Sequence, residues 1–216
     1  MIKIVFDMDG VLFDTQRIYY RTWFDVADRL GLSDITEPAK ACIGTNRNYQ
    51  YGVLKKYYGE DFPLKEFYSL KDRLYTEYVE ANGVPLKEGT IEILEFLKAD
   101  NAKVAIASSS RKQMIENHLS RHNMIGYFDE IVGGDMVEHS KPSPDIYLKA
   151  CQVLGFDPSD CYAVEDSYNG LRAAYSAGLK PVMVPDMQPY NEEIAKIVFK
   201  KFDSLTDLRK YLESVR

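Results

Sequence analysis

Short apolar runs alternate with amphipathic segments through most of this 216-residue chain. The runs at residues 2–6, 103–107, 131–132, 161–164 and 181–184 are predicted strands. Helices are predicted over residues 88–100, 111–121, 144–154, 168–177 and 204–214. The strand runs are mostly apolar and show no alternation of apolar and polar residues, which is typical of strands buried on both faces of a sheet. The pattern therefore predicts an α/β fold in which helices cover both faces of a parallel sheet.

A helical block interrupts this pattern after the first predicted strand. Residues 15–31, 47–58 and 64–81 carry apolar side chains at helical spacing, and residues 15–82 contain no convincing strand. The block must leave the sheet after the first strand and return near the breaker cluster at 82–85. We therefore predict a Rossmann-like core formed by residues 1–14 and 83–216, with an inserted α-helical cap domain at residues 15–82.

Charge and composition exclude several classes of protein. The net charge is −6, whereas nonspecific nucleic-acid binding needs a basic surface. No apolar stretch approaches the length of a transmembrane helix, and the apolar start is too short for a signal peptide. Cys42, Cys151 and Cys161 show no metal-ligand spacing and are expected to be free thiols. We expect a cytoplasmic monomer that binds neither nucleic acid nor membranes.

Polar side chains follow the predicted strands at their carboxyl ends, the edge at which open parallel sheets bind ligands. Several carboxylates at one edge would repel each other unless a cation neutralised them, and oxygen ligands without histidine or thiolate favour Mg²⁺. A hydroxyl and an ammonium group beside the metal could hold phosphate oxygens. One carboxylate could then attack phosphorus while another transfers the proton. The candidate residues are Asp7, Asp9, Ser108, Lys141, Glu165 and Asp166.

The same residues resemble the motifs of a known family. The stretch DMDGVLFD, from Asp7 to Asp14, resembles the DxDGxxxD signature of the haloacid dehalogenase superfamily. Ser108 after a strand, Lys141 before a proline and the pair Glu165-Asp166 follow in the expected order. The stretch EDSYNGLRAAYSAG, at residues 165–178, is similar to the fourth-motif region of the phosphatase and phosphomutase branch. The resemblance covers the whole chain and is strongest to the subfamily that contains β-phosphoglucomutase and phosphoglycolate phosphatase.

This resemblance implies a Mg²⁺-dependent phosphatase that hydrolyses a small phosphorylated metabolite, such as a sugar or polyol phosphate, through an aspartyl phosphate. Asp7 would be the nucleophile, and Asp9 would act as general acid and then as general base. Ser108 and Lys141 would hold the transferred phosphate. The metal would be held by Asp7, Asp166 and the main-chain carbonyl of Asp9, with Glu165 supporting the metal shell.

The segment at residues 44–48 is polar and carries Arg47. In capped relatives a loop at the matching place faces the active site, so Arg47 is a candidate contact to a distal group of the substrate. The alternative is a turn that starts a helix. The mutase has a histidine where this chain has Tyr19, which favours a phosphatase. Arg47 matches the mutase pattern, so a β-phosphoglucomutase-type phosphomutase stays the alternative.

Other chemistries fit the motifs less well. A phospho-acceptor regulatory module would need neither the helical insert nor Asp9. Dehalogenation needs no Mg²⁺ and would not use the second aspartate. Phosphonate cleavage would need a cap lysine that the sequence does not identify. Locally, Ser110 is predicted to cap the helix that starts near Arg111, and Ser167 the helix that follows it.

Overall fold

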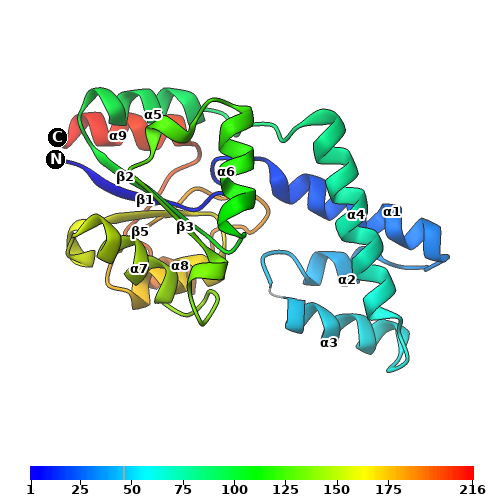
Figure 1. The fold of residues 1–216 in the computed structure, drawn as a ribbon. Coiled ribbons are helices and arrows are strands. Elements are labelled where there is room, and N and C mark those ends of the chain that lie inside the picture. Colours follow the sequence, from blue (N-terminus) through cyan, green and yellow to red (C-terminus); the bar gives the residue numbers. More distant parts are fainter. Residues whose placement is uncertain (46) are drawn as a thin grey trace. The chain divides into compact units, whose positions relative to one another are not determined.

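The structure is a computed structural model that describes residues 1–45 and 47–216 (Figure 1). Its chain forms two compact units. The core unit consists of Met1–Asp14 and Pro85–Arg216, and the helical unit of Thr15–Val84. The predicted boundary between residues 14 and 15 falls at the first division, and the one between residues 82 and 83 lies just before the second. The assignment of these units as catalytic core and cap stays a prediction.

The described residues of the core unit contain a sheet of six strands in the order β3-β2-β1-β4-β5-β6. All neighbouring strands are parallel, which confirms the predicted α/β fold. β1 lies between β2 and β4, and its residues Ile4, Val5 and Phe6 are fully buried. The strands are β1 (Lys3–Phe6), β2 (Lys103–Ser108), β3 (Glu130–Gly133), β4 (Tyr162–Glu165), β5 (Lys180–Met183) and β6 (Lys200–Lys201).

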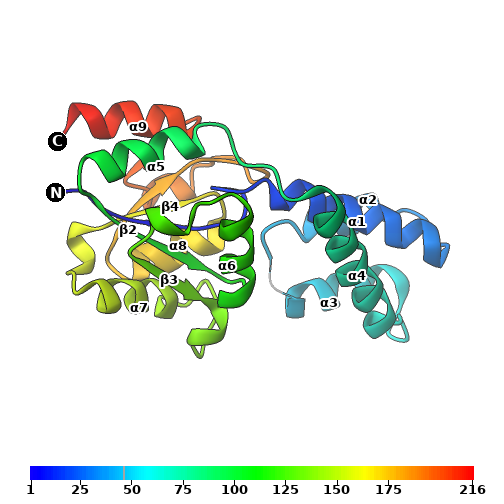
Figure 2. The same cartoon turned by 45° about the horizontal axis from the view of Figure 1, so that its top comes forward.

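Helices cover both faces of this sheet. Figures 1 and 2 show α5 and α9 side by side on one face, and α7 and α8 on the other. The α-helices are α5 (Thr90–Ala99), α6 (Lys112–Arg121), α7 (Asp145–Leu154), α8 (Tyr168–Ser176) and α9 (Leu205–Ser214). Short 3₁₀ helices are η1 (Ile125–Tyr127), η2 (Gly134–Met136), η3 (Pro158–Asp160) and η4 (Ile194–Lys196).

Side-chain caps fix the start of two of these helices. The Ser167 hydroxyl accepts a hydrogen bond from the Gly170 amide at 3.1 Å, which confirms the predicted cap of α8. The Ser204 hydroxyl accepts one from the Asp207 amide at 3.1 Å at the start of α9. Each bond satisfies an amide that has no partner within its own helix. The cap at Ser167 ends the β4 loop and so helps to position the acidic residues there.

The helical unit has a core of its own. It contains α1 (Thr15–Leu30), α2 (Thr36–Ala41), α3 (Arg47–Tyr58) and α4 (Leu64–Asn82). Trp23 and Phe67 lie at its centre with ring centroids 5.3 Å apart, and Phe62 contacts Phe67 at 5.6 Å. Such aromatic pairs add to the stabilisation from buried apolar area. No helix in the described part of the chain combines the length and apolar character that a membrane crossing requires.

Candidate active site

Asp7 is held at the end of the central strand by a tight turn. Its amide donates a hydrogen bond to the Val164 carbonyl at 2.9 Å, which continues the pairing of β1 with β4. Gly10 has a φ of 85°, a left-handed conformation that favours glycine, and its amide donates to the Phe13 carbonyl at 2.8 Å. The chain therefore reverses directly after Asp9. As a result the Asp7 side chain is buried at the carboxyl edge of the sheet.

Three buried carboxylates meet at this edge. Asp7, Glu165 and Asp166 each offer an oxygen, and these atoms lie within 4.8 Å of one another. The Lys141 ammonium group lies among them, with Nζ 2.6 Å from Asp7 Oδ1 and 2.5 Å from Glu165 Oε1. It also donates to the Ala107 carbonyl at 3.0 Å. The structure therefore brings together four of the residues that the sequence predicts for the site.

Protein groups already occupy both oxygens of Glu165. Oε1 accepts from Lys141 and from the Tyr147 hydroxyl at 2.7 Å. Oε2 accepts from the Asp166 amide at 3.2 Å and the Ser167 hydroxyl at 3.1 Å. The sequence does not predict Tyr147, since it has the pattern of an ordinary buried helix residue. These contacts suit Glu165 to orient its neighbours more than to bind a ligand itself.

Burial dominates the acidity of the cluster. It raises the pKa of Asp7 to about 8, because the Lys141 charge offsets the loss of water only in part and Glu165 and Asp9 repel a further negative charge. Burial also raises the pKa of Asp166 well above its ordinary value, with Glu165 and Asp7 adding to the effect. Burial acts to lower the pKa of Lys141, but Asp7 and Glu165 outweigh it and raise that pKa above its ordinary value. The cluster thus favours added positive charge.

The donor set fits a metal ion. When all three carboxylates are ionised, they and the one ammonium group leave a formal charge of −2 in a buried site (−3 from Asp7, Glu165 and Asp166, +1 from Lys141). All the donors are oxygens, and hard oxygen donors bind hard divalent cations. The residues therefore form a site that suits a metal ion.

Asp9 lies outside this group of three carboxylates. Its Oδ2 atom accepts hydrogen bonds from the Ser108 hydroxyl at 3.2 Å and the Ser110 hydroxyl at 2.9 Å. The prediction that Ser110 caps the helix α6 is wrong, because the N-cap position of α6 is Arg111, whose side chain makes no capping hydrogen bond. The run of three serines is a signal for this contact, but which hydroxyl reaches Asp9 depends on the fold. Ser108, which is fully buried, is where the sequence predicts it.

Arg47 belongs to the helical unit. It is the first residue of α3, and its Nη2 atom donates to Asp72 Oδ1 at 2.9 Å and Oδ2 at 3.1 Å. Its guanidinium group also lies over the Tyr68 ring, 4.6 Å from the centroid. Asn46, in the same predicted segment, lies outside the described residues. The contact between Arg47 and a substrate stays a prediction.

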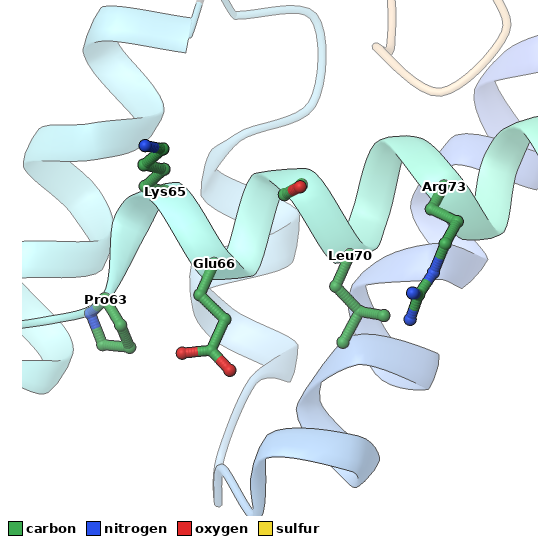
Figure 3. A pocket seen from close by; sticks show the side chains of 6 residues that line it. Pro63, Lys65, Glu66, Leu70 and Arg73 are labelled. Carbon is green, nitrogen blue, oxygen red and sulfur yellow. The ribbon is translucent and has the colours of Figure 1, made fainter.

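One hollow in the helical unit holds none of the predicted residues. It follows the first turns of α4, where Glu66, Leu70 and Arg73 project to one side (Figure 3). Its charged groups carry both signs, and it contains no cluster of carboxylates. The lining residues are Pro63, Lys65, Glu66, Ser69, Leu70 and Arg73.

Comparison with known proteins agrees with this geometry. Residues 4–184 match the family described as haloacid dehalogenase-like hydrolase. The chain is similar to the phosphorylated carbohydrates phosphatase of Thermotoga maritima, with 33% identity over 184 residues that cover 84% of each protein. It is similar to hexitol phosphatase B of Escherichia coli, with 28% identity over 210 residues, 96% of this chain and 94% of that protein. The crystal structure of CbbY from Rhodobacter sphaeroides in complex with phosphate has a TM-score of 0.77 and 26% identity, and the match covers 96% of both chains. The chain belongs to the haloacid dehalogenase-like hydrolase family.

Proposed function

We propose that this chain is a Mg²⁺-dependent phosphatase that hydrolyses a small sugar or polyol phosphate through an aspartyl phosphate on Asp7. The observation that carries the proposal is the buried group of Asp7, Lys141, Glu165 and Asp166 at the carboxyl edge of the sheet. Relatives named as phosphatases of phosphorylated carbohydrates and of hexitols support the substrate class.

Asp7 is the proposed nucleophile. A carboxylate attacks phosphorus only when it is ionised, and Lys141 at 2.6 Å favours the ionised form against the cost of burial. Mg²⁺, bound by Asp7, Asp166 and the main-chain carbonyl of Asp9, would supply the further positive charge that the nucleophile and the phosphate oxygens need. The fixed position of Asp7 at the strand end restricts it to one direction of attack.

Asp9 is the proposed general acid and base. It would protonate the leaving oxygen as the aspartyl phosphate forms, and then remove a proton from the water that hydrolyses it. The hydroxyl groups of Ser108 and Ser110 donate to Asp9 and so orient its carboxylate. Ser108 is also proposed to hold the phosphate, together with Lys141, by turning its hydroxyl proton from Asp9 to a phosphate oxygen.

Glu165 is proposed to act through its neighbours. Its Oε1 atom holds the Lys141 ammonium group at 2.5 Å, and its Oε2 atom accepts from the loop that carries Asp166. Glu165 would thereby fix both the phosphate-binding lysine and a metal-binding carboxylate, and we place it in the outer metal shell. Arg47 is proposed to contact a distal group of the substrate.

We also propose that the enzyme is a cytoplasmic monomer that binds neither nucleic acid nor membranes. Its cysteines, Cys42, Cys151 and Cys161, are free, as expected in a reducing compartment. Light scattering across a range of protein concentrations tests the monomer, because a stable dimer would double the measured mass.

Phosphate release from a panel of sugar and polyol phosphates tests the proposed function. Each compound is assayed with Mg²⁺ and with a chelator, and the Asp7→Asn variant serves as the blank. We expect fast release that needs Mg²⁺ and is absent in the variant. Full activity of Asp7→Asn would exclude Asp7 as the nucleophile. Conversion of β-glucose 1-phosphate to the 6-phosphate without net release, once a bisphosphate primer is added to phosphorylate Asp7, would show a phosphomutase instead.

A further inference from the structure

The segment after β5 runs along the loop after β4. The Val184 amide donates to the Glu165 carbonyl at 2.9 Å, and the Tyr168 amide donates to Gln188 Oε1 at 2.7 Å. The Tyr168 hydroxyl also donates to the Pro189 carbonyl at 2.6 Å. Residues 184–189 therefore lie beside residues 165–168, at the edge of the sheet that carries the metal cluster. Asp186 is in the middle of this segment.

Asp186 is paired with a lysine from a distant part of the chain. Lys87 Nζ lies 2.7 Å from Asp186 Oδ1, and the Asp186 side chain is only 1% exposed. Lys87 is in the segment by which the chain returns to the core unit, and its amide donates to the Leu12 carbonyl at 2.9 Å. The ion pair thus joins the returning chain to the loop beside Asp166.

The charge of Asp186 acts on the metal cluster. The negative charge of Asp186 contributes to the raised pKa of Asp166, after the larger effects of burial, Glu165 and Asp7. A largely buried ion pair is also an inefficient way to stabilise a fold, because apolar side chains of similar size often do as well or better. The presence of charged groups at positions 87 and 186 therefore needs an explanation other than the stability of the fold.

We propose that Asp186 is a positioning residue whose negative charge acts on Asp166 and so strengthens metal binding. Lys87 holds the Asp186 side chain in place, and its positive charge limits this effect. The inference rests on the metal site of the proposed function. A neutral residue at 186 leaves the Lys87 charge alone beside the cluster, where it repels a divalent cation. A neutral residue at 87 leaves the Asp186 charge alone, where it attracts the cation.

Calorimetric titration of the metal-free protein with Mg²⁺ at pH 8 tests this inference without an activity assay. Relative to the unsubstituted chain, we expect Asp186→Asn to raise the Kd about fivefold or more and Lys87→Met to lower it by a similar factor. The double variant should return to within about twofold, since it removes both charges. Lys87→Arg keeps the charge and should bind Mg²⁺ like the unsubstituted chain.

A more exposed ion pair at the opposite edge of the sheet gives a control for the change of charge. Lys3 is the first residue of β1, and its Nζ lies 2.9 Å from Asp160 Oδ2. Asp160→Asn makes the same change of charge in the same unit, and we expect it to leave the Kd unchanged. In the phosphatase assay, Asp186→Asn should raise the Mg²⁺ concentration for half-maximal rate while kcat at saturating Mg²⁺ stays within about twofold.

The possible failures are distinct. Shifts of Kd in the same direction in Asp186→Asn and Lys87→Met would show a structural brace and overturn the inference. An unchanged Kd in Asp186→Asn would overturn it as well. Absence of Mg²⁺ binding by the unsubstituted chain would overturn the metal site itself, and the inference with it. Thermal melts identify any variant that fails to fold, and Asp186→Asn and Lys87→Arg each remain informative without Lys87→Met.

Discussion

Gly170 has no side chain, and the Glu165 carboxylate occupies the space that a side chain would need. A Cβ atom on Gly170 would lie 1.9 Å from Glu165 Oε1, so any larger residue must displace the carboxylate that holds Lys141. We expect Gly170→Ala to cost about 1–3 kcal/mol of unfolding free energy and to lower kcat/KM about tenfold or more, because Lys141 and the Asp166 loop lose their common partner. Denaturant unfolding and steady-state kinetics measure the two effects.

Gly52 is the control for this substitution. It also lies inside a helix, α3, and apart from the backbone of that helix and its chain neighbours no atom lies within 4 Å of the position of its Cβ. Alanine favours helices over glycine by up to about 1 kcal/mol, so Gly52→Ala should stabilise the protein slightly and leave the kinetics unchanged. Equal effects of the two substitutions would mean that Gly170 has no special relation to Glu165.

The hydroxyl groups around Asp9 give a second test on this scale. Asp9→Asn should lower kcat by a factor of about 10²–10⁴, because an amide cannot exchange the proton. Ser110→Ala removes the 2.9 Å hydrogen bond to Asp9 but keeps the carboxylate, and we expect a loss of about tenfold. Single-turnover kinetics should show both the formation and the hydrolysis of the phosphoenzyme slowed in Asp9→Asn. A normal rate for either step would remove Asp9 from that step.

At the scale of helices and strands, the sequence predicts the elements whose signal is local. The strands β1, β2, β4 and β5 stand out as apolar runs, and the acidic residues of the site lie at the carboxyl ends of β1 and β4. β6 does not stand out, because its two lysines pair with Val182 and Met183 on a neighbouring strand and carry no pattern of their own. α2 does not stand out either, because it has only six residues and lacks a side-chain cap.

The contacts in the site that the sequence does not predict also join residues that are far apart in the sequence. Tyr147 reaches Glu165 from α7 and Ser110 reaches Asp9 across 101 positions of sequence. Asp186 reaches Lys87 across 99 positions. Each contact depends on which side of a helix or loop faces the sheet edge, and no spacing in the sequence determines that. Asp7, Asp9, Ser108, Glu165 and Asp166 could be predicted because each lies at or just after the carboxyl end of a strand, whereas Lys141, in the loop before α7, is predicted from its family motif.

The packing of α4 against α1 in the helical unit contains a buried lysine that predicts an unusual dependence on pH. Lys71 is fully buried, and its Nζ lies over the Tyr19 ring with no hydrogen-bond partner among the described residues. Burial lowers its pKa from 10.5 to about 6. Between these values the unfolded chain binds the proton and the native chain does not. The free energy of unfolding should therefore rise with pH, by about 1.4 kcal/mol per unit.

Lys71→Met should reduce this slope and stabilise the helical unit at pH 7. Urea unfolding at several pH values between about 6.5 and 9.5 gives the slope, with Trp23 fluorescence as the probe. Lys65→Met, on the exposed side of the same helix, should leave the slope as it is. Equal slopes for the Lys71→Met variant and the unsubstituted chain would mean that Lys71 is protonated in the native state.

For the molecule as a whole, the division into two compact units, with the metal cluster of the described residues in one of them, predicts that Mg²⁺ stabilises that unit only. The metal cluster belongs to the core unit, whereas Trp23, the one tryptophan of the chain, is buried in the helical unit. Binding to the native state at 100 times Kd adds about 2.7 kcal/mol to the free energy of unfolding. In thermal melts Mg²⁺ should raise the transition seen by circular dichroism by several degrees and leave the Trp23 transition in place. Asp166→Asn should abolish the shift, because it removes a metal-binding carboxylate. If both probes shift together, the two units unfold as one and the metal stabilises the whole chain.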